Sequence, residues 1–355
     1  MELKQKLLNI FNQFKTDANF KGFQTFSSGH INDTYLIITN SSINYVLQKI
    51  NGTVFKKAID VIHNKVKISD FLLQKGVKTI RFIPTNKNTF YIEDKENNYW
   101  NLSEFIENSQ TFLQVNSNDI AYQAGLATGT FLAHTTDYTD NLVEVLPSFH
   151  SMSFRFQEFQ NALTSASKTR KEKAIKWISL VKETIEKMMV IENAIQLKKI
   201  PLRVTHNDTK ISNILFNEQN EAICLIDLDT VMQGSILFDY GDALRTICST
   251  ASEDETDLSL INFNVEYFKN YTKGFLKSIS TQITKEELFY LPKSISVMVF
   301  IMGLRFLTDY LNNDIYYKTK YSEHNIDRAI NQFTLLQKVD AYEHEINDYI
   351  KSATT

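Results

Sequence analysis

The chain contains very little glycine and proline, and this scarcity restricts the folds and phosphate-binding motifs open to it. Ten of its 355 residues are glycine and four are proline, whereas average usage of roughly 7% and 5% would give about 25 and 18. Collagen-like repeats and proline-rich linkers are excluded, and a chain of many tight hairpins is disfavoured. Neither the G-x-G-x-x-G fingerprint of dinucleotide-binding proteins nor the G-x-x-x-x-G-K-[ST] phosphate loop occurs. Any phosphate site must therefore be built with few glycines.

The rest of the composition indicates a globular protein with a core and gives no reason to expect a nucleic-acid partner. Hydrophobic residues make up 43% of the chain, charged residues 22%, and the net charge is −3. Two cysteines, Cys224 and Cys248, are too few for a disulfide framework and lack the spacing of a zinc site. The first residues, MELKQKLLNIFNQF, predict an amphipathic helix rather than a signal peptide. We therefore expect a cytoplasmic protein without a membrane partner.

The first hundred residues have the pattern of an antiparallel sheet with one inserted helix. Residues 55–75 have helical spacing of apolar side chains, and Gly76 follows directly. The segments with strand character are 23–26, 35–39, 45–50, 79–83, 89–92 and 99–105.

From residue 118 onward the chain is predicted to be mainly helical. Residues 119–134 form a predicted helix in which Gly125 and Gly129 allow close packing. Two short strands are expected at 214–216 and 222–226. The most apolar stretch, 294–304, is too short to span a bilayer and predicts a buried helix that ends before Arg305. The pattern is that of a small β-rich lobe and a larger helical lobe, joined around residues 100–118.

The polar segment THNDTKISN, residues 205–213, carries the residue types that phosphoryl transfer requires. His206 and Asp208 are one residue apart, and Asn213 follows five residues after Asp208. The reaction needs a carboxylate beside the attacking hydroxyl and oxygen ligands for Mg²⁺. An apolar strand ends at Asp227, fourteen residues after Asn213, and a hairpin between them would bring both ligands together. The alternative is an ordinary polar loop with local turn hydrogen bonds.

On these residues the chain resembles the aminoglycoside phosphotransferase and choline kinase superfamily, and in detail its N-acetylhexosamine 1-kinase branch. The resemblance covers about residues 23–335. It implies an α+β, bilobal, protein-kinase-like fold. A small antiparallel β N-lobe with one helix, 1–104, would bind nucleotide, and a larger mainly α-helical C-lobe, 105–355, would hold the catalytic loop and the substrate. The segments that carry the closer resemblance are GHINDTY (29–35), YVLQKIN (45–51), RVTHNDTK (203–210), CLIDLDTVM (224–232), FDYGD (238–242) and GLRFLTDYL (303–311).

The resemblance also implies roles for individual residues and makes ATP and Mg²⁺ the expected cofactors. Asp208 would be the catalytic base, Asn213 and Asp227 the Mg²⁺ ligands, and Asp229 a ligand of a second metal through water. The hinge that contacts adenine would lie within 101–107. The residues implied in nucleotide binding are Ser28, Gly29, His30, Asn32, Thr34, Gln48, Lys49, Glu104 and Ile106. Those implied in substrate binding are His30, Asp33, Asp208, Arg305 and Tyr316.

The chain departs from the family pattern at the phosphate-binding lysine. Alignment with relatives puts Gln48 at the position of the usual third-strand lysine, and Lys49 lies one step away. The predicted helix 55–75 contains no glutamate, so the usual Lys–Glu ion pair cannot form in its standard arrangement. Asp60 and Asp70 are the acidic residues on this helix that can substitute.

Two further positions leave alternatives open. The loop 29–33 contains one glycine, so it must also use the side chains of Ser27, Ser28 and His30; His30 can instead reach the sugar or lie on the surface. A guanidinium that follows an apolar helix is costly unless it is paired. Arg305 is therefore expected either to pair with Asp309 or Asp242 or to contact sugar hydroxyls or the N-acetyl group.

The expected activity is ATP-dependent phosphorylation of the anomeric hydroxyl of N-acetylglucosamine or N-acetylgalactosamine by a monomer or weak dimer. One alternative is a kinase of another small alcohol, such as choline, homoserine or an aminoglycoside. The acidic run 253–255 would suit such a cationic substrate. The other alternative is a non-catalytic nucleotide- or sugar-binding relative, because the Lys–Glu pair is missing.

Overall fold

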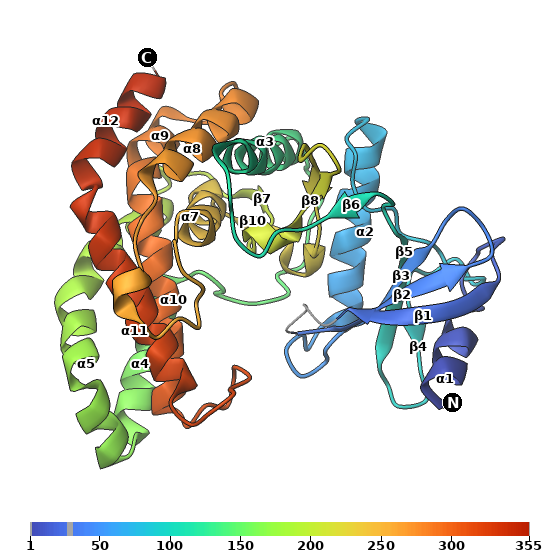
Figure 1. Ribbon diagram of the computed structural model, residues 1–355, viewed down its shortest axis with the longest axis horizontal. Helices are drawn as coiled ribbons and strands as arrows, with labels where there is room; N and C mark the ends of the chain where they lie inside the picture. Colours follow the sequence, from blue (N-terminus) through green and yellow to red (C-terminus); the bar gives the residue numbers. More distant parts are fainter. Residues whose placement is uncertain (1, 27–30, 355) are drawn as a thin grey trace. The chain divides into compact units, whose positions relative to one another are not determined.

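The computed structural model describes residues 2–26 and 31–354 of the chain (Figure 1). They form two compact units, and the chain passes between them more than once. The first unit comprises Met1–Gln110, Asp137–Pro147 and Leu215–Gln233, and the second comprises Thr111–Thr136, Ser148–Ile214 and Gly234–Thr355. The segments 137–147 and 215–233 therefore cluster with the strand-rich part of the chain.

The first unit is built on a five-stranded antiparallel sheet of order β1-β2-β3-β5-β4. Its strands are β1 (Phe20–Phe26), β2 (Asp33–Thr39), β3 (Tyr45–Lys49), β4 (Ile92–Glu93) and β5 (Tyr99–Glu104). Alternate residues of the central strands, among them Ile37, Leu47 and Leu102, are fully buried. They pack with Leu7 and Phe11 of helix α1 (Glu2–Phe11), which lies against the sheet (Figure 1). The strand predicted over 79–83 is wrong, because only an isolated bridge from Phe82 to Ser103 forms there.

Helix α2 (Ala58–Gln74) confirms the helix predicted at 55–75. Gly76 takes a left-handed conformation, with φ of 75°, which most other residues adopt only at a cost. This turn lets the N–H of Val77 donate to the Leu72 carbonyl at 3.0 Å and so close the helix.

The first unit also contains a small three-stranded sheet of order β6-β8-β9, whose last strand comes just before the predicted Mg²⁺ ligand Asp227 in the sequence. It consists of β6 (Ser109–Gln110), β8 (Ile214–Asn217) and β9 (Ala222–Leu225). The turn from β8 to β9 is held by the Asn217 side chain, which accepts the N–H groups of Gln219 and Glu221 at 3.0 and 2.8 Å. The short strands predicted on either side of this turn are confirmed.

The second unit is mainly helical. Helices α3 (Asn118–Thr135) and α8 (Val265–Ile279) lie side by side (Figure 1), because Gly125 and Gly129 admit the α8 backbone where a side chain would collide. The close packing predicted for these glycines is confirmed. The other elements are α4 (Met152–Ser165), α5 (Lys168–Met188), α6 (Val190–Gln196), β7 (Arg203–Thr205), α7 (Ile236–Ile247), α9 (Lys285–Tyr290), α11 (His324–Ala341) and α12 (Glu343–Ala353). Strand β10 (Met232–Gly234) contains the boundary at which the chain passes from the first unit into the second for the last time.

Helix α10 (Ser294–Leu311) is the apolar helix predicted at 294–304, extended by about two turns. Arg305 therefore lies inside the helix rather than after its end. Within the described residues, Lys285–Leu311 is the one helical stretch long and apolar enough to pass for a membrane span, and 83% of its most apolar window is buried. The burial confirms a core helix. The α+β class and the strand-then-helix layout are also confirmed.

Candidate active site

The segment after β7 is fixed by a fully buried carboxylate of helix α7. The two side-chain oxygens of Asp239 accept the backbone N–H groups of His206 and Asn207 at 2.8 and 2.7 Å. Asn207 itself has a left-handed backbone, with φ of 64°. The carboxylate thus holds this turn in a conformation that it would not otherwise favour, and the next residue is Asp208.

Asp208 is held as a carboxylate by its neighbours in the same segment. Its Oδ2 accepts from Lys210 Nζ at 2.9 Å and from Asn213 Nδ2 at 2.8 Å. Burial opposes ionisation of Asp208, but the Lys210 charge and the hydrogen bonds from Lys210 and Asn213 outweigh it and hold its pKa below the usual value. The side chain remains 28% exposed. Asp208 can therefore accept a hydrogen bond or a proton from a hydroxyl brought to it.

The orientation of Asn213 suits a metal ligand. Its amide nitrogen donates to both the backbone carbonyl and the carboxylate of Asp208, so its amide oxygen points elsewhere. Asp227, two residues after the end of β9, has a left-handed backbone with φ of 61°, a strained state of the kind that is frequent at functional sites. Amide and carboxylate oxygens are ligands that Mg²⁺ accepts. Nowhere in the described ranges do three His, Cys, Asp or Glu side chains form a metal cluster, and Mg²⁺ commonly takes only one or two carboxylates together with phosphates.

Asp229 has other partners in the first unit. One of its oxygens forms an ion pair with Lys65 of α2 and the other accepts from Asn32 Nδ2. The carboxylate is 4% exposed. Both of its oxygens are thus engaged, and its role as ligand of a second metal stays a prediction.

The lysine of this ion pair, Lys65, lies on helix α2, where the sequence predicted an acidic residue. Lys65 Nζ also donates to Gln48 Oε1 on β3 at 2.6 Å. Asp60 and Asp70 form no ion pair in the described part of the molecule, and burial raises the pKa of Asp70. The expectation that one of them replaces the missing glutamate is wrong. The helix residue that faces Gln48 of β3 is Lys65, which is a cation and not an acid.

Gln48 and Lys49, which are neighbours on β3, lie in different environments. Lys49 pairs with Asp33 on β2, and both side chains are partly exposed, at 30% and 51%. Gln48 stands opposite Thr34 and Asn101 in the sheet register. Asp33 is thus bound to Lys49, and its predicted contact with substrate stays a prediction.

Part of the predicted nucleotide loop falls beyond what the structure covers. Ser28, Gly29 and His30 lie outside the described residues. Asn32 is described, and it joins two segments by donating to Asp229 and accepting the Asn51 N–H at 2.8 Å.

The predicted hinge follows strand β5. Glu104 ends the strand and donates its N–H to the Arg81 carbonyl at 2.9 Å. The Ile106 carbonyl accepts the Ser109 hydroxyl, whereas no partner is recorded for the Ile106 N–H among the residues described. A backbone N–H in this state can donate to a ligand, as the resemblance implies for adenine.

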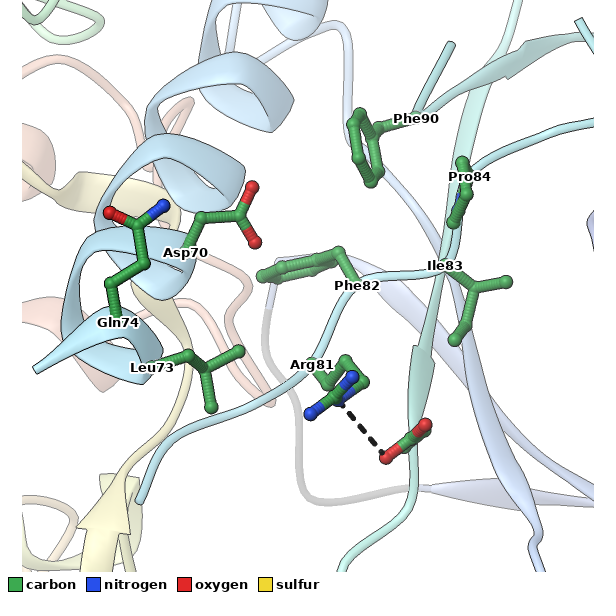
Figure 2. A pocket seen from close by; sticks show the side chains of 9 residues that line it. Asp70, Leu73, Gln74, Arg81, Phe82, Ile83, Pro84 and Phe90 are labelled. Carbon is green, nitrogen blue, oxygen red and sulfur yellow. Dashed lines mark ion pairs between the residues drawn. The ribbon is translucent and has the colours of Figure 1, made fainter. Parts of the chain in front are cut away.

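A pocket of about 510 Å³ opens in the first unit between α2 and residues 81–84 (Figure 2). Asp70 and Gln74 of α2 lie on one side of it and Phe82 on the other. Arg81 and Glu104, which form an ion pair at 3.8 Å, also line it. Among the described residues, Glu104 is the one nucleotide-binding candidate in its lining. We therefore do not assign the nucleotide to this pocket.

Arg305 lies among aromatic rings of the second unit. Its guanidinium is 5.1, 5.7 and 5.6 Å from the ring centres of Phe149, Tyr316 and Tyr317. No carboxylate comes within ion-pair distance of it in the described part of the chain. The alternative of a structural ion pair is wrong, because both proposed partners are otherwise engaged. Asp309 accepts the backbone N–H groups of residues 315–317, and Asp242 pairs with Arg245.

Two polar groups near Arg305, on His150 and Tyr317, were not predicted from the sequence as site residues. His150 Nδ1 and the Tyr317 hydroxyl are buried without a hydrogen-bond partner within the residues described. Burial and the charges of Arg305 and Arg155 lower the pKa of His150 to about 3, so the imidazole is neutral. No spacing in the sequence links His150 to Arg305. The clustering of aromatic residues around 310–321 was the only available signal for Tyr317.

Two of the three acidic residues in the run 253–255 are neutralised by other residues of the protein. Glu253 pairs with Arg245, and Asp254 is surrounded by Lys320, His324 and Arg328. Burial opposes ionisation of Asp254, but the hydrogen bonds from Lys320 and Arg328 and the Arg328 charge outweigh it and hold the pKa of Asp254 far below its usual value. The run therefore offers no unpaired negative charge at Glu253 or Asp254 for a cationic substrate.

Comparison with protein families agrees with this arrangement. Residues 22–271, well over half of the chain, match the model of the phosphotransferase enzyme family. The chain belongs to the phosphotransferase enzyme family. The matched region contains the segment around Asp208 and both predicted Mg²⁺ ligands.

Solved structures with the same fold include other phosphotransferases. An amicoumacin kinase in complex with AMP-PNP, Ca²⁺ and Ami is 12% identical, with a TM-score of 0.64, over 94% of this chain and 93% of that one. A microcompartment-associated aminopropanol kinase is also 12% identical, with a TM-score of 0.64, over 97% and 98%. The ethanolamine kinase of Plasmodium vivax is 14% identical, with a TM-score of 0.57, over 89% and 82%. These likenesses confirm the kinase-like fold of this phosphotransferase.

Proposed function

We propose that this phosphotransferase transfers the γ-phosphoryl group of ATP to the anomeric hydroxyl of an N-acetylhexosamine. The observation that carries the proposal is the ionised Asp208, which is positioned by Asn213 and Lys210 and is partly exposed. Asp208 would accept the hydrogen bond and then the proton of the attacking hydroxyl. A carboxylate with a lowered pKa is a weak base, and an anomeric hydroxyl is more acidic than an ordinary alcohol. Orientation of the hydroxyl therefore matters more than basicity.

The Mg²⁺ ligands in this proposal are Asn213 and Asp227. When bound, the ion neutralises charge on the transferring phosphoryl group. Asn213 has a second function, because its amide nitrogen fixes the Asp208 carboxylate while its oxygen remains for the ion. The remaining nucleotide contacts would come from Asn32, Thr34 and Gln48 in the 1–104 region and from the hinge at Glu104 and Ile106. Catalysis and sugar binding would belong to 105–355, in a cytoplasmic monomer or weak dimer.

The surroundings of Arg305 favour a neutral sugar over a cationic alcohol. A guanidinium without a carboxylate needs an acceptor oxygen, and an N-acetyl carbonyl or a sugar hydroxyl supplies one. Tyr316 is 53% exposed and offers a ring face to a sugar. A cationic amino alcohol would instead meet like charge, and Glu253 and Asp254 are already paired.

A panel of acceptors tests the proposal. We expect ATP consumption with N-acetylglucosamine and N-acetylgalactosamine, and at least about 100-fold lower kcat/KM with choline, ethanolamine, homoserine and aminoglycosides. Phosphate on the anomeric oxygen would be identified by ³¹P and ¹H NMR of the product. Turnover of a cationic alcohol in place of the hexosamines would overturn the substrate assignment. No turnover by the wild-type protein with any acceptor, despite nucleotide binding, would favour a binding protein.

Substitution of Arg305 tests the sugar contact separately. We expect Arg305→Met to raise KM for the sugar about 10- to 50-fold, because a charge-assisted hydrogen bond to substrate is lost. KM for ATP should remain within about two-fold. Folding stability should not fall by much, since none of the described carboxylates loses its partner. Steady-state kinetics and thermal unfolding measure these effects.

Arg328 provides a matched control for that substitution. It also stands over an aromatic ring, 5.5 Å from the centre of Phe306, but it is paired with Asp254. Arg328→Met should lower stability and leave KM for the sugar unchanged. If Arg305→Met instead loses stability and keeps its KM, Arg305 is a structural residue.

A further inference from the structure

We propose that Lys65, a residue of helix α2, supplies the ammonium that contacts the nucleotide phosphates in this phosphotransferase. In protein kinases this cation is a lysine of the third strand that pairs with a helix glutamate. Here the cation would come from the helix, and its partners would be a strand amide and the carboxylate of Asp229. The inference rests on the proposed use of ATP.

Strand β3 cannot provide the cation in the usual way. The residue that faces α2 is Gln48, whose amide carries no charge. Lys49 points to the opposite face of the pleated strand and pairs with Asp33 across to β2. Its side chain is 30% exposed, so its charge lies at the surface of the first unit.

Lys65 is buried beside the position that the strand lysine would occupy. It is 3% exposed. Its Nζ lies 2.6 Å from Gln48 Oε1, pairs with Asp229 Oδ1 and stands 5.6 Å from the ring centre of Phe82. An ammonium has three N–H donors. Gln48 and Asp229 use two of them, and the third has no partner within the described residues.

The neighbours of Lys65 restrict its motion. The second oxygen of Asp229 accepts from Asn32, and Asn32 accepts the Asn51 N–H in turn. The ammonium is therefore held by a chain of hydrogen bonds that joins α2, β3 and the segment after β9. Burying both charges offsets most of their attraction, so such a pair contributes little to stability compared with apolar residues of the same size. The arrangement does hold the Lys65 ammonium in a fixed position, with one N–H donor that no described residue accepts.

Two different roles for these lysines compete with the proposed one. Lys65 could hold α2 to the sheet and touch no ligand, or Lys49 could turn to the phosphates when nucleotide binds. The first role predicts that loss of Lys65 affects every nucleotide and nucleoside alike. The second predicts that Lys49 is the sensitive residue.

Calorimetric binding of ADP and of adenosine, measured with EDTA present, distinguishes the three roles without any turnover. We expect Lys65→Met to raise the Kd of ADP about 10- to 100-fold, because a charge-assisted hydrogen bond to phosphate is lost. The Kd of adenosine, which has no phosphate, should stay within about two-fold. Lys67→Met is the matched control, since Lys67 is an exposed lysine of the same helix that only reaches the Asn141 carbonyl. It should bind both ligands like the wild type.

An exchange variant keeps the proposal testable if Lys65→Met does not fold. Gln48→Lys combined with Lys65→Gln retains one ammonium, one amide and Asp229, and moves the cation to the strand. We expect Lys65→Gln alone to bind ADP weakly and the exchange variant to recover affinity to within about five-fold of the wild type.

Several outcomes would overturn the inference. They are wild-type ADP affinity in folded Lys65→Met, equal weakening of ADP and adenosine, no recovery in the folded exchange variant, or a loss of ADP binding in Lys49→Met that Lys65→Met does not show. Failure of the wild-type protein to bind ADP at all is a different result. It would overturn the proposed function itself.

Discussion

Asp208→Asn is expected to lower kcat about 1,000-fold with the best sugar acceptor, while KM for ATP changes by less than about three-fold. Asparagine fills the same space but cannot take the proton of the attacking hydroxyl. Its oxygen can still accept from Lys210 or Asn213, which now hold the carboxylate at 2.9 and 2.8 Å. The loop should therefore keep its shape. Single-turnover kinetics with saturating ATP and sugar would measure the chemical step directly.

The control for this substitution is Asp348→Asn, which removes a surface carboxylate of α12 that is 66% exposed. It should show wild-type kinetics. Thermal unfolding of both variants within about 2 °C of the wild type would establish that the folds are intact. Turnover by Asp208→Asn at the wild-type rate would rule out Asp208 as the base.

The pH profile follows from the same carboxylate. Because the pKa of Asp208 is lowered, its ionised form persists down to acid pH. Asp208 should therefore produce no fall in kcat/KM between pH 8 and about pH 5.

Asp239→Asn is expected to reduce kcat about 10- to 100-fold and to lower the free energy of unfolding by about 2 kcal/mol. Both oxygens of Asp239 accept backbone N–H groups, from His206 and Asn207. An amide replaces one of these acceptors by a donor, so one buried N–H would face another donor. The turn that carries Asp208 would then shift, although Asp239 itself touches no reactant.

The stability effect of this substitution should depend on pH with a defined sign. Burial and the charges of Asp242 and Asp208 outweigh the two N–H donors and raise the pKa of Asp239 to about 7. In the unfolded chain the carboxyl titrates near its ordinary value of about 3.9. The stabilisation from this group is thus complete at low pH and is lost as pH rises towards 7, at up to about 1.4 kcal/mol per pH unit.

Urea unfolding of the wild type and of Asp239→Asn at pH 5 and pH 8 measures this dependence. The difference in unfolding free energy should be larger at pH 5. Asp348→Asn again serves as the control and should show no comparable dependence. A difference that grows with pH would mean that the folded protein prefers the ionised carboxylate.

Features with a local cause could be predicted from the sequence. Gly76 marked the end of α2, because neighbouring residues determine where a helix ends. The short strands predicted at 214–216 and 222–226 likewise form, as β8 and β9. The segment 205–213 was recognisable because the chemistry fixes residue types at fixed spacing. By contrast, the expected strand at 79–83 has suitable residues but forms only an isolated bridge with Ser103.

Pairings between distant residues were not predictable. Lys65 meets Gln48, 17 positions away, and Asp229, 164 positions away, and no local pattern marks a lysine on a helix as the partner of both. The same holds for Arg305, for which an ion pair with Asp309 or Asp242 was one of the two alternatives left open by the sequence. Asp309 was near in sequence, but its carboxylate accepts backbone N–H groups of residues 315–317 instead.

The few glycines of this chain have a consequence for which substitutions it tolerates. At six of the nine described glycines a methyl group would lie within 3.0 Å of another atom, and these are Gly125, Gly129, Gly234, Gly241, Gly274 and Gly303. Alanine normally improves a helix in place of glycine. In α3, α7, α8 and α10 the gain in helix propensity would be overridden, because the neighbouring backbone or ring occupies the space. The open positions are Gly22 and Gly52, outside any helix, where replacement meets nothing within 4 Å. The glycines inside the helices are therefore harder to replace than Gly22 of β1 and Gly52, whereas Gly76 is required for its left-handed φ of 75°.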